Sequence, residues 1–228
     1  MFFDKQELNG KIIEVLSIII GIESCLVMTG WIFGIDFLTR TYPAGINMKF
    51  PTALMFFFSS VGLYLIYRII KDNSELSVMI LPGIVLSLFL IMGVILLANL
   101  TNTEAGLLAD ITGTQTGIEN LFVVKGDPVY ASGAGNPAII TIFNFFLFGF
   151  ACINSLFDFF YRSKIFKFIG LFMATVSLVS IIGYLFSFPV LYFEFSGLTP
   201  LAFNTALCFF LLGTGLIIVS KIKTIYEV

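Results

Sequence analysis

The chain lacks histidine altogether, and charged residues make up only 11% of its 228 positions. Without an imidazole it has no usual axial ligand for haem and lacks the commonest ligand for zinc or copper. Its three cysteines, Cys25, Cys152 and Cys208, all lie inside apolar runs, which favours buried thiols over a disulfide framework or a CxxC metal site. We therefore expect no metal site and no cofactor.

Sequence signatures of the common enzyme classes are also missing. There is no P-loop, GxSxG or HExxH motif, and no pair of carboxylates at a catalytic spacing. The net charge is −2 and no basic block is present, so nothing indicates a nucleic-acid partner. Asp110, Glu119 and Asp127 share one segment but lack the close, ordered spacing of a calcium loop. The sequence predicts a protein that is not an enzyme.

Apolar residues dominate the chain. They make up 58% of it, and the mean hydropathy is +1.04, whereas a soluble domain is about 45–50% apolar and about 25% charged. The N-terminal stretch carries acids and no small-residue cleavage site, so the first apolar run is not expected to be a cleaved signal peptide. The composition indicates an integral membrane protein whose surroundings are the lipid bilayer.

Six apolar runs approach the length of about 20 residues that a membrane-spanning helix needs. They cover residues 12–33, 50–67, 76–100, 137–157, 168–186 and 200–220. Asn136-Pro137 and Thr199-Pro200 predict the starts of the fourth and sixth helices, each as an N-cap residue followed by a proline. The expected fold is an all-α integral membrane protein, with six transmembrane helices in one polytopic domain over residues 1–228.

Lysine and arginine are unevenly divided between the two sides of these spans. One side holds Lys5, Lys11, Arg68, Lys71, Arg162, Lys164, Lys167, Lys221 and Lys223, and the other holds Arg40, Lys49 and Lys125. The positive-inside rule therefore predicts a multi-pass protein of the cell membrane with both termini in the cytoplasm. The longest outer segment, 101–136, lies between helices three and four and is expected to form a small cap. Aromatic residues near the outer side fit an interfacial belt: Trp31, Tyr42, Tyr184 and Tyr192.

The chain repeats itself. “FPTALMFFFSSVG” at 50–62 and “FNTALCFFLLGTG” at 203–215 match at an offset of 153, and the same offset relates Gly30 to Gly183. A weaker copy, “ITIFNFFLFG”, occupies 140–149. Because repeats determine architecture, we expect three parallel helical hairpins, at about 12–70, 76–160 and 165–220, in a pseudo-threefold bundle. The enlarged outer loop lies between helices 3 and 4.

The matched stretches “GWIFGIDFL…MKFPTALMFFF” and “GYLFSFPVL…LAFNTALCFFLLGTGL” resemble a known family. It comprises the six-helix N-terminal membrane modules of bacterial and archaeal sensor histidine kinases, which also precede PAS and diguanylate cyclase domains. The resemblance covers residues 12–220 and implies a prokaryotic sensor module made of three hairpins. Pro51 departs from the asparagine of the family motif, and the middle copy lacks Asn-x-Ala-Leu. No kinase, PAS or cyclase sequence follows, which leaves open an isolated module or a free-standing relative.

Glu23 is the one acid deep inside a predicted span. Intramembrane acids are costly and are candidates for function. No span offers it a lysine or arginine, so we expect it to be protonated, or hydrogen-bonded to a serine, threonine or asparagine of a neighbouring helix. Its role is then either an ion-, proton- or ligand-sensing carboxyl or a group that fixes helix packing. Val176 stands at the equivalent position of the third hairpin.

Thr52, Thr141 and Thr205 lie one turn inside the outer ends of the returning helices. They predict either packing between helices or a polar ring that holds a small ligand, to which Asn144 and Asn204 would add.

Two functions from different classes fit these features. The first is a non-enzymatic sensor or signalling module that transmits an outer or intramembrane stimulus through helix packing. The alternative is an accessory or structural transmembrane subunit of a larger membrane protein complex. A transporter ranks third, because only one intramembrane charge is present. Either leading function implies a homo-oligomer or other membrane protein subunits as partners.

Overall fold

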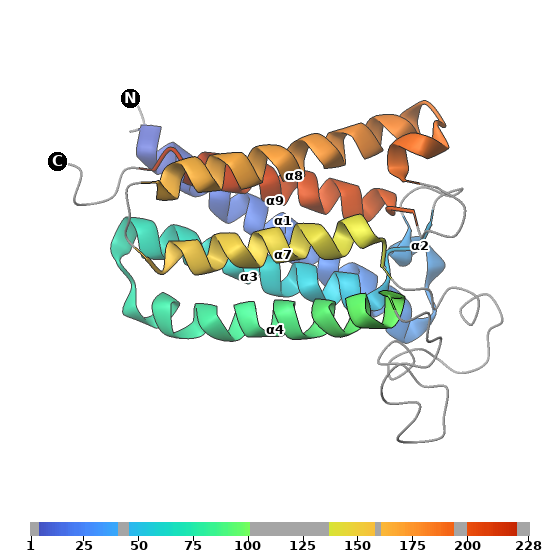
Figure 1. Cartoon of the computed structure of the whole chain (residues 1–228), viewed down its shortest axis with the longest axis horizontal. Helices are drawn as coiled ribbons and strands as arrows, with labels where there is room; N and C mark the ends of the chain where they lie inside the picture. The colour runs from blue at the N-terminus through green and yellow to red at the C-terminus, as the bar shows by residue number, and fades with distance from the viewer. Residues whose placement is uncertain (1–4, 41–45, 101–136, 158–160, 194–199, 223–228) are drawn as a thin grey trace, which may run out of the picture.

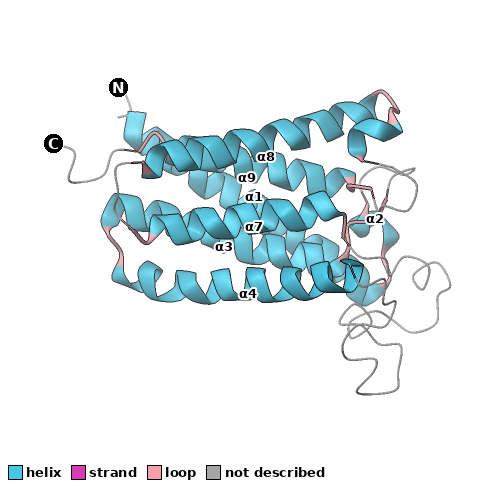
Figure 2. Ribbon diagram, viewed as in Figure 1, coloured by secondary structure: helices cyan, strands magenta, loops and turns pink. Residues whose placement is uncertain are grey.

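The computed structural model describes residues 5–40, 46–100, 137–157, 161–193 and 200–222, and all regular structure within them is helical (Figure 2). The long helices are α1 (Lys5–Phe33), α3 (Phe50–Asp72), α4 (Glu75–Leu100), α7 (Ile139–Ser155), α8 (Arg162–Leu185) and α9 (Phe203–Val219). The short elements are α2 (Asp36–Thr39) and the 3-10 helix η2 (Pro189–Tyr192). The prediction of an all-helical fold is confirmed.

The long helices lie side by side in one bundle (Figure 1). Helices α1, α4 and α8 run toward the end of the bundle where α2 lies, which we call the α2 end, and α3, α7 and α9 run away from it. Four helices (α1, α3, α4 and α8) are long and apolar enough to cross a membrane, whereas α7 and α9 are apolar but have 17 residues each. These helices are typical of a membrane protein, as the composition predicts.

The predicted starts of α7 and α9 are wrong. The helices begin at Ile139 and Phe203, and their N-cap residues are Ala138 and Ala202. Both N-caps have a non-helical backbone, with ψ of 143° and 149°. Each preceding proline therefore lies outside the helix, and both helices are shorter than the apolar runs that predict them.

The core of the bundle lies between α3, α7 and α9. Of the most apolar 18-residue stretch of α3, 67% is buried, compared with 28% in α1 and α4. Phe56 of α3, Phe145 of α7 and Phe209 of α9 meet at the centre, with ring centroids 4.5–4.8 Å apart in all three pairs. Because each ring meets the others at a steep angle, the three aromatic side chains interlock.

The closest-packed pairs are α8 with α9, α1 with α3, and α4 with α7. Two glycines account for the close approach of α8 and α9. A Cβ atom on Gly170 would lie 2.6 Å from the Gly213 carbonyl oxygen, and one on Gly213 would lie 2.7 Å from the Gly170 oxygen. The two backbones touch at this point, as they do where small residues line membrane helix interfaces.

The chain turns in the same way after α1 and after α8. Three backbone hydrogen bonds of the first turn recur in the second with every residue number raised by 153. In the first turn these bonds run from Ile35 N to Gly30 O, from Leu38 N to Ile35 O and from Met48 N to Thr39 O. In the second turn they run from Phe188 N to Gly183 O, from Leu191 N to Phe188 O and from Leu201 N to Tyr192 O. Each bond agrees in length with its counterpart, at 2.8, 3.1 and 2.9 Å.

Two aromatic side chains hold these turns in place. Trp31 Nε1 donates to the Met48 carbonyl oxygen at 2.7 Å, and Tyr184 Oη donates to that of Leu201 at 2.8 Å. Both side chains are buried, at 3% and 5% exposed. Their assignment to a lipid-facing aromatic belt is therefore wrong, because their polar groups bond to the protein backbone.

The left-handed residue of each turn gives a first prediction. Gly34 has φ of 68° and Ser187, its counterpart 153 positions on, has φ of 55°. A residue with a Cβ atom costs about 1–2 kcal/mol in this region, and Ser187 is exposed. We expect Ser187→Gly to raise the free energy of unfolding by about 1 kcal/mol, measured by thermal unfolding in detergent followed by circular dichroism.

Gly34→Ser is the matched reverse change. A Cβ at Gly34 would meet no heavy atom within 4 Å, so backbone strain alone should lower the stability by a similar amount. A Ser187→Gly protein that melts below the native chain would contradict this account.

Candidate functional site

Glu23 and Asn204 form a polar link between the first and the last long helix. The Asn204 Nδ2 atom donates to Glu23 Oε1 at 2.9 Å, from α9 to α1. Of the alternatives that the sequence leaves open for Glu23, the structure shows the hydrogen bond to an asparagine of a neighbouring helix. The bond spans 181 positions of the chain, so it depends on how the bundle is assembled.

The position of Asn204 suits a partner for a carboxyl group. It is the second residue of α9 and is 3% exposed, while Glu23 is partly buried. The N-terminal end of a helix carries a partial positive charge that favours a nearby carboxylate. At the offset of 153, Val176 corresponds to Glu23 and Pro51 corresponds to Asn204. Neither valine nor proline has a side chain that could form such a hydrogen bond. The link is therefore a departure from the repeat.

The three threonines of the predicted ring come together at the α2 end. Thr52, Thr141 and Thr205 are each the third residue of their helix, are 2–3% exposed, and line one cavity of about 10 Å³. Their equivalence in the repeat predicts this meeting.

The two asparagines do not join the threonine ring. Asn204 bonds Glu23 instead, and Asn144 lies one helical turn deeper than Thr141. Neither residue lines the cavity. The Asn144 side chain is fully buried, and neither of its amide atoms has a partner among the described residues. A buried amide without partners is costly, and the sequence gives no signal of this arrangement.

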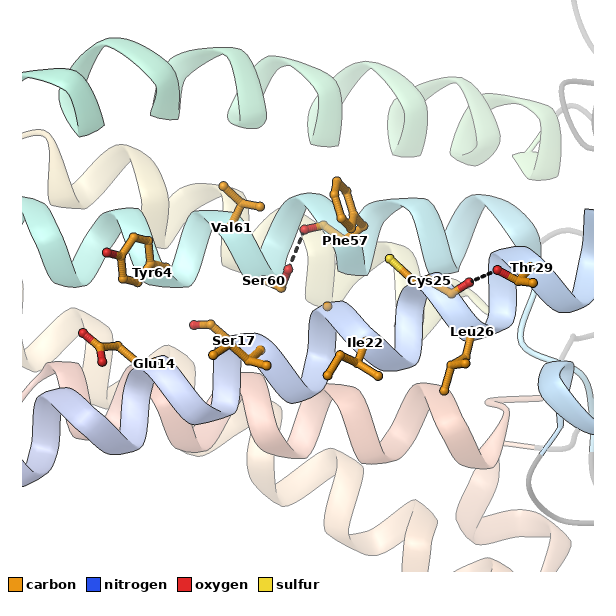
Figure 3. Close-up of a pocket in the computed structure, with 12 residues that line it drawn as sticks. Glu14, Ser17, Ile22, Cys25, Leu26, Thr29, Phe57, Ser60, Val61 and Tyr64 are labelled. Atoms are coloured by element: carbon orange, nitrogen blue, oxygen red, sulfur yellow. Dashed lines mark hydrogen bonds between the residues drawn. The ribbon is translucent and has the colours of Figure 1, made fainter.

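A groove between α1 and α3 is the feature that sequence reasoning missed (Figure 3). Its volume is about 750 Å³, and Glu14 and Tyr64 lie at one end. Small residues at four-residue spacing line the α1 side: Ser17, Gly21, Cys25 and Thr29. The Ser17 hydroxyl has no hydrogen-bond partner within the described part of the chain. The spacing itself, which typifies helix–helix contacts in membranes, is the signal that could have revealed it.

No three side chains of histidine, cysteine, aspartate or glutamate gather as metal ligands among the described residues. The 101–136 segment, with Asp110, Glu119 and Asp127, lies outside them.

In the described residues, the fold and these sites define a helical bundle with four helices long and apolar enough to cross a membrane, a polar link between its first and last long helices, and a threonine-lined cavity. Comparison of the chain with protein families, with curated proteins and with solved structures finds no match. The resemblance to sensor modules stays a prediction, and function has to be argued from the geometry.

Proposed function

We propose that this chain is a non-enzymatic sensor or signalling module of the membrane, in which an outer or intramembrane stimulus changes the packing of the helices. The Glu23–Asn204 hydrogen bond carries the proposal, because it joins the side chains of the first and the last long helix, α1 and α9. With an ionised Glu23, this hydrogen bond would contribute about 1.5–3 kcal/mol. Making or breaking it is enough to move a two-state equilibrium about 10- to 100-fold.

Six spans and three hairpins form the frame of the proposed module. Helices α7 and α9, with 17 residues each, reach the lower limit for a span, about 17 residues. The chain just before them is not helical, but Ala138 and Ala202 are buried, and irregular backbone at membrane depth is tolerated where protein covers it. The hydrogen bonds at an offset of 153 and the meeting of Phe56, Phe145 and Phe209 support a pseudo-threefold repeat.

The proposed orientation puts both termini in the cytoplasm. Lys11, Arg68 and Lys71 belong to the end of the bundle opposite α2, and Arg40 and Lys49 belong to the α2 end. Together with the excess of basic residues in the sequence on the first side, this favours the α2 end as the outer one. A stimulus at the α2 end would then reach the cytoplasm along α9, whose first turn holds the Glu23 link.

Distances between spin labels on α1 and α9 test this proposal. Leu8→Cys and Lys221→Cys place labels at exposed positions near the start of α1 and after α9, in a background whose three native cysteines are alanine. In proteoliposomes, Glu23→Leu and Asn204→Leu should each redistribute the label-to-label distance in the same direction, by about 10-fold or more in population. Glu23→Gln, which keeps an acceptor oxygen, should have a smaller effect.

Glu14→Leu is the matched control, since Glu14 lies on the same helix in the α1–α3 groove and does not contact Asn204. It should leave the distances unchanged. The native chain, Glu23→Leu and Asn204→Leu could instead all give the same distance distribution. That result would show a rigid bundle and overturn the proposal.

The α1–α3 groove favours a second candidate, an accessory subunit of a membrane complex. The Ser17 hydroxyl, which has no partner among the described residues, lies in a row of small residues along the groove. Such a row suits contact with a helix of another subunit. Stoichiometric co-purification with a membrane complex, lost on Gly21→Leu and kept on Gly93→Leu, would support this alternative.

A further inference from the structure

The groove between α1 and α3 lies where the first hairpin departs from the third. In the third hairpin, Gly170 of α8 and Gly213 of α9 let the two backbones touch. At the offset of 153, the same positions in the first hairpin are Ser17 of α1 and Ser60 of α3, and both serines line the groove. Two hydroxymethyl side chains therefore stand between α1 and α3 where the third hairpin has only hydrogen atoms. A hollow of about 750 Å³ lies along this contact.

The shape of the groove suits a slender chain. Its floor is narrow, because a Cβ atom on Gly21 of α1 would lie 3.1 Å from Ser60 Oγ of α3. Apolar side chains that are 36–59% exposed form its walls: Ile18, Ile22, Leu26, Phe57 and Val61. A helix with its side chains is about 10–12 Å wide, too wide to enter between two helices that nearly touch. A hydrocarbon chain can enter, and the volume lies in the range of small-molecule sites, about 300–1,000 Å³.

Three polar side chains gather at one end of this apolar groove. Figure 3 shows Glu14, Ser17 and Tyr64 there, between α1 and α3. Ser17 is only 7% exposed, and its hydroxyl has no hydrogen-bond partner among the described residues. Within the same residues, Glu14 forms no ion pair. A buried hydroxyl without a partner is costly, so this end of the groove calls for a ligand with a polar head.

The charges at this end have both signs. Glu14 supplies a carboxylate, and its field reaches the Lys71 ammonium on α3. Arg68 Nη1 donates to Tyr64 Oη at 3.1 Å, which places a guanidinium beside the phenol, and the same guanidinium pairs with Asp72 at 2.8 Å. A purely anionic head would be repelled by Glu14, and a purely cationic head would be repelled by Arg68. A zwitterionic head complements both groups.

We propose that the α1–α3 groove binds a phospholipid with an ethanolamine headgroup. The primary ammonium would donate to the Glu14 carboxylate and the Ser17 hydroxyl, and the phosphate would accept from the Tyr64 hydroxyl. One acyl chain would lie along the groove toward Thr29, which lines its other end. The site does not rest on the signalling proposal, and it competes with the subunit contact for the same groove.

Thermal unfolding of the delipidated full chain in detergent micelles tests the headgroup. Phosphatidylethanolamine, phosphatidylcholine and phosphatidylglycerol are added with identical acyl chains. A ligand that binds the folded state raises the melting temperature in a saturable manner. We expect this with phosphatidylethanolamine alone. The quaternary ammonium of phosphatidylcholine cannot donate a hydrogen bond to Glu14, and phosphatidylglycerol carries no positive charge.

Cys25 reports on the groove directly. It lines the groove and is exposed, whereas Cys152 and Cys208 are buried. An acyl chain in the groove should therefore slow the alkylation of Cys25 by N-ethylmaleimide. The half-maximal effect should fall at the same mole fraction of phosphatidylethanolamine as the rise in melting temperature.

Variants of the polar end identify the site. Glu14→Gln removes the charge at nearly constant shape and should raise the half-saturating fraction of phosphatidylethanolamine about tenfold. Ser17→Ala should raise it about threefold or more, and it should also raise the melting temperature of the lipid-free protein by removing a buried hydroxyl without a partner. Glu75→Gln is the matched control, since Glu75 is exposed at the same end of the bundle, on α4, and does not line the groove. It should keep the native response.

Three results would overturn the lipid site. Equal responses to phosphatidylethanolamine and phosphatidylcholine, or an unchanged response in both Glu14→Gln and Ser17→Ala, would mean that any lipid chain covers the groove. Slow alkylation of Cys25 in lipid-free protein that elutes as an oligomer would mean that another subunit covers it. If Glu14→Gln fails to fold, Ser17→Ala still decides the question. The spin-label distances are measured in phosphatidylcholine vesicles, where this site is empty and Glu14→Leu stays a valid control.

Discussion

A leucine at Gly213 is expected to lower the free energy of unfolding by more than about 3 kcal/mol. A Cβ atom there would lie 2.7 Å from the Gly170 carbonyl oxygen and 2.8 Å from the Ala174 backbone nitrogen. Both contacts are to backbone, so no side-chain rotation relieves them and α8 must move away from α9. Overpacking a core costs about 1–3 kcal/mol when side chains alone must adjust, and separating two helices costs more.

The measurement is thermal unfolding in detergent micelles, with helicity followed by circular dichroism. One kcal/mol corresponds to about 2–4 °C in a chain of this size, so the melting temperature should fall by more than about 6 °C. Gly93→Leu on α4 is the matched control, because a Cβ there meets no heavy atom within 4 Å. It should leave the melting temperature unchanged or raise it, since leucine favours the helix over glycine.

A Gly213→Leu protein that melts within a degree of the native chain would contradict the backbone contact. Gly170→Leu approaches the same contact from α8, where a Cβ would lie 2.6 Å from Gly213 O. It should reproduce the loss. Agreement between the two variants would locate the effect at the α8–α9 interface.

The helices themselves could be predicted because they depend on local properties. The length of an apolar run sets where a membrane helix lies, and α3 begins at Phe50 as the sequence predicts. The starts of α7 and α9 could not be predicted in this way. An N-cap residue before a proline is a general signal, but here each proline lies two or three residues before its helix and lines the small cavity at the α2 end of the bundle.

The threonine ring could be predicted from the sequence repeat, since equivalent residues of the proposed pseudo-threefold bundle would approach the same axis. The partner of Glu23 could not be specified, because Asn204 is 181 positions away and the sequence does not show which face of α1 meets α9. Trp31 shows the same limit. Its amphipathic ring suits a membrane interface, but its indole bonds Met48 O within the protein.

Phe209→Ala is expected to lower the free energy of unfolding by about 3 kcal/mol. In water the loss of a core phenylalanine costs about 3–5 kcal/mol, of which part is transfer from water. Lipid is as apolar as the core, so in a membrane that part is small. The remaining cost has two parts: the empty cavity and the loss of two contacts between aromatic rings. The Phe209 ring centroid lies 4.5 Å from that of Phe56 and 4.8 Å from that of Phe145, and each such contact contributes about 0.5–1.5 kcal/mol.

The control for this change is Phe150→Ala on α7, since the Phe150 side chain is 53% exposed on the surface of the bundle. Lipid can fill the space that it leaves, and the melting temperature should change by less than about 2 °C, or under 1 kcal/mol. A double-mutant cycle with Phe56→Ala separates the contributions. Because both residues line the space that either deletion opens, the two losses should not add, and the double variant should lose less than their sum. Additive losses, or equal losses at Phe209 and Phe150, would mean that the three rings do not form one packed unit.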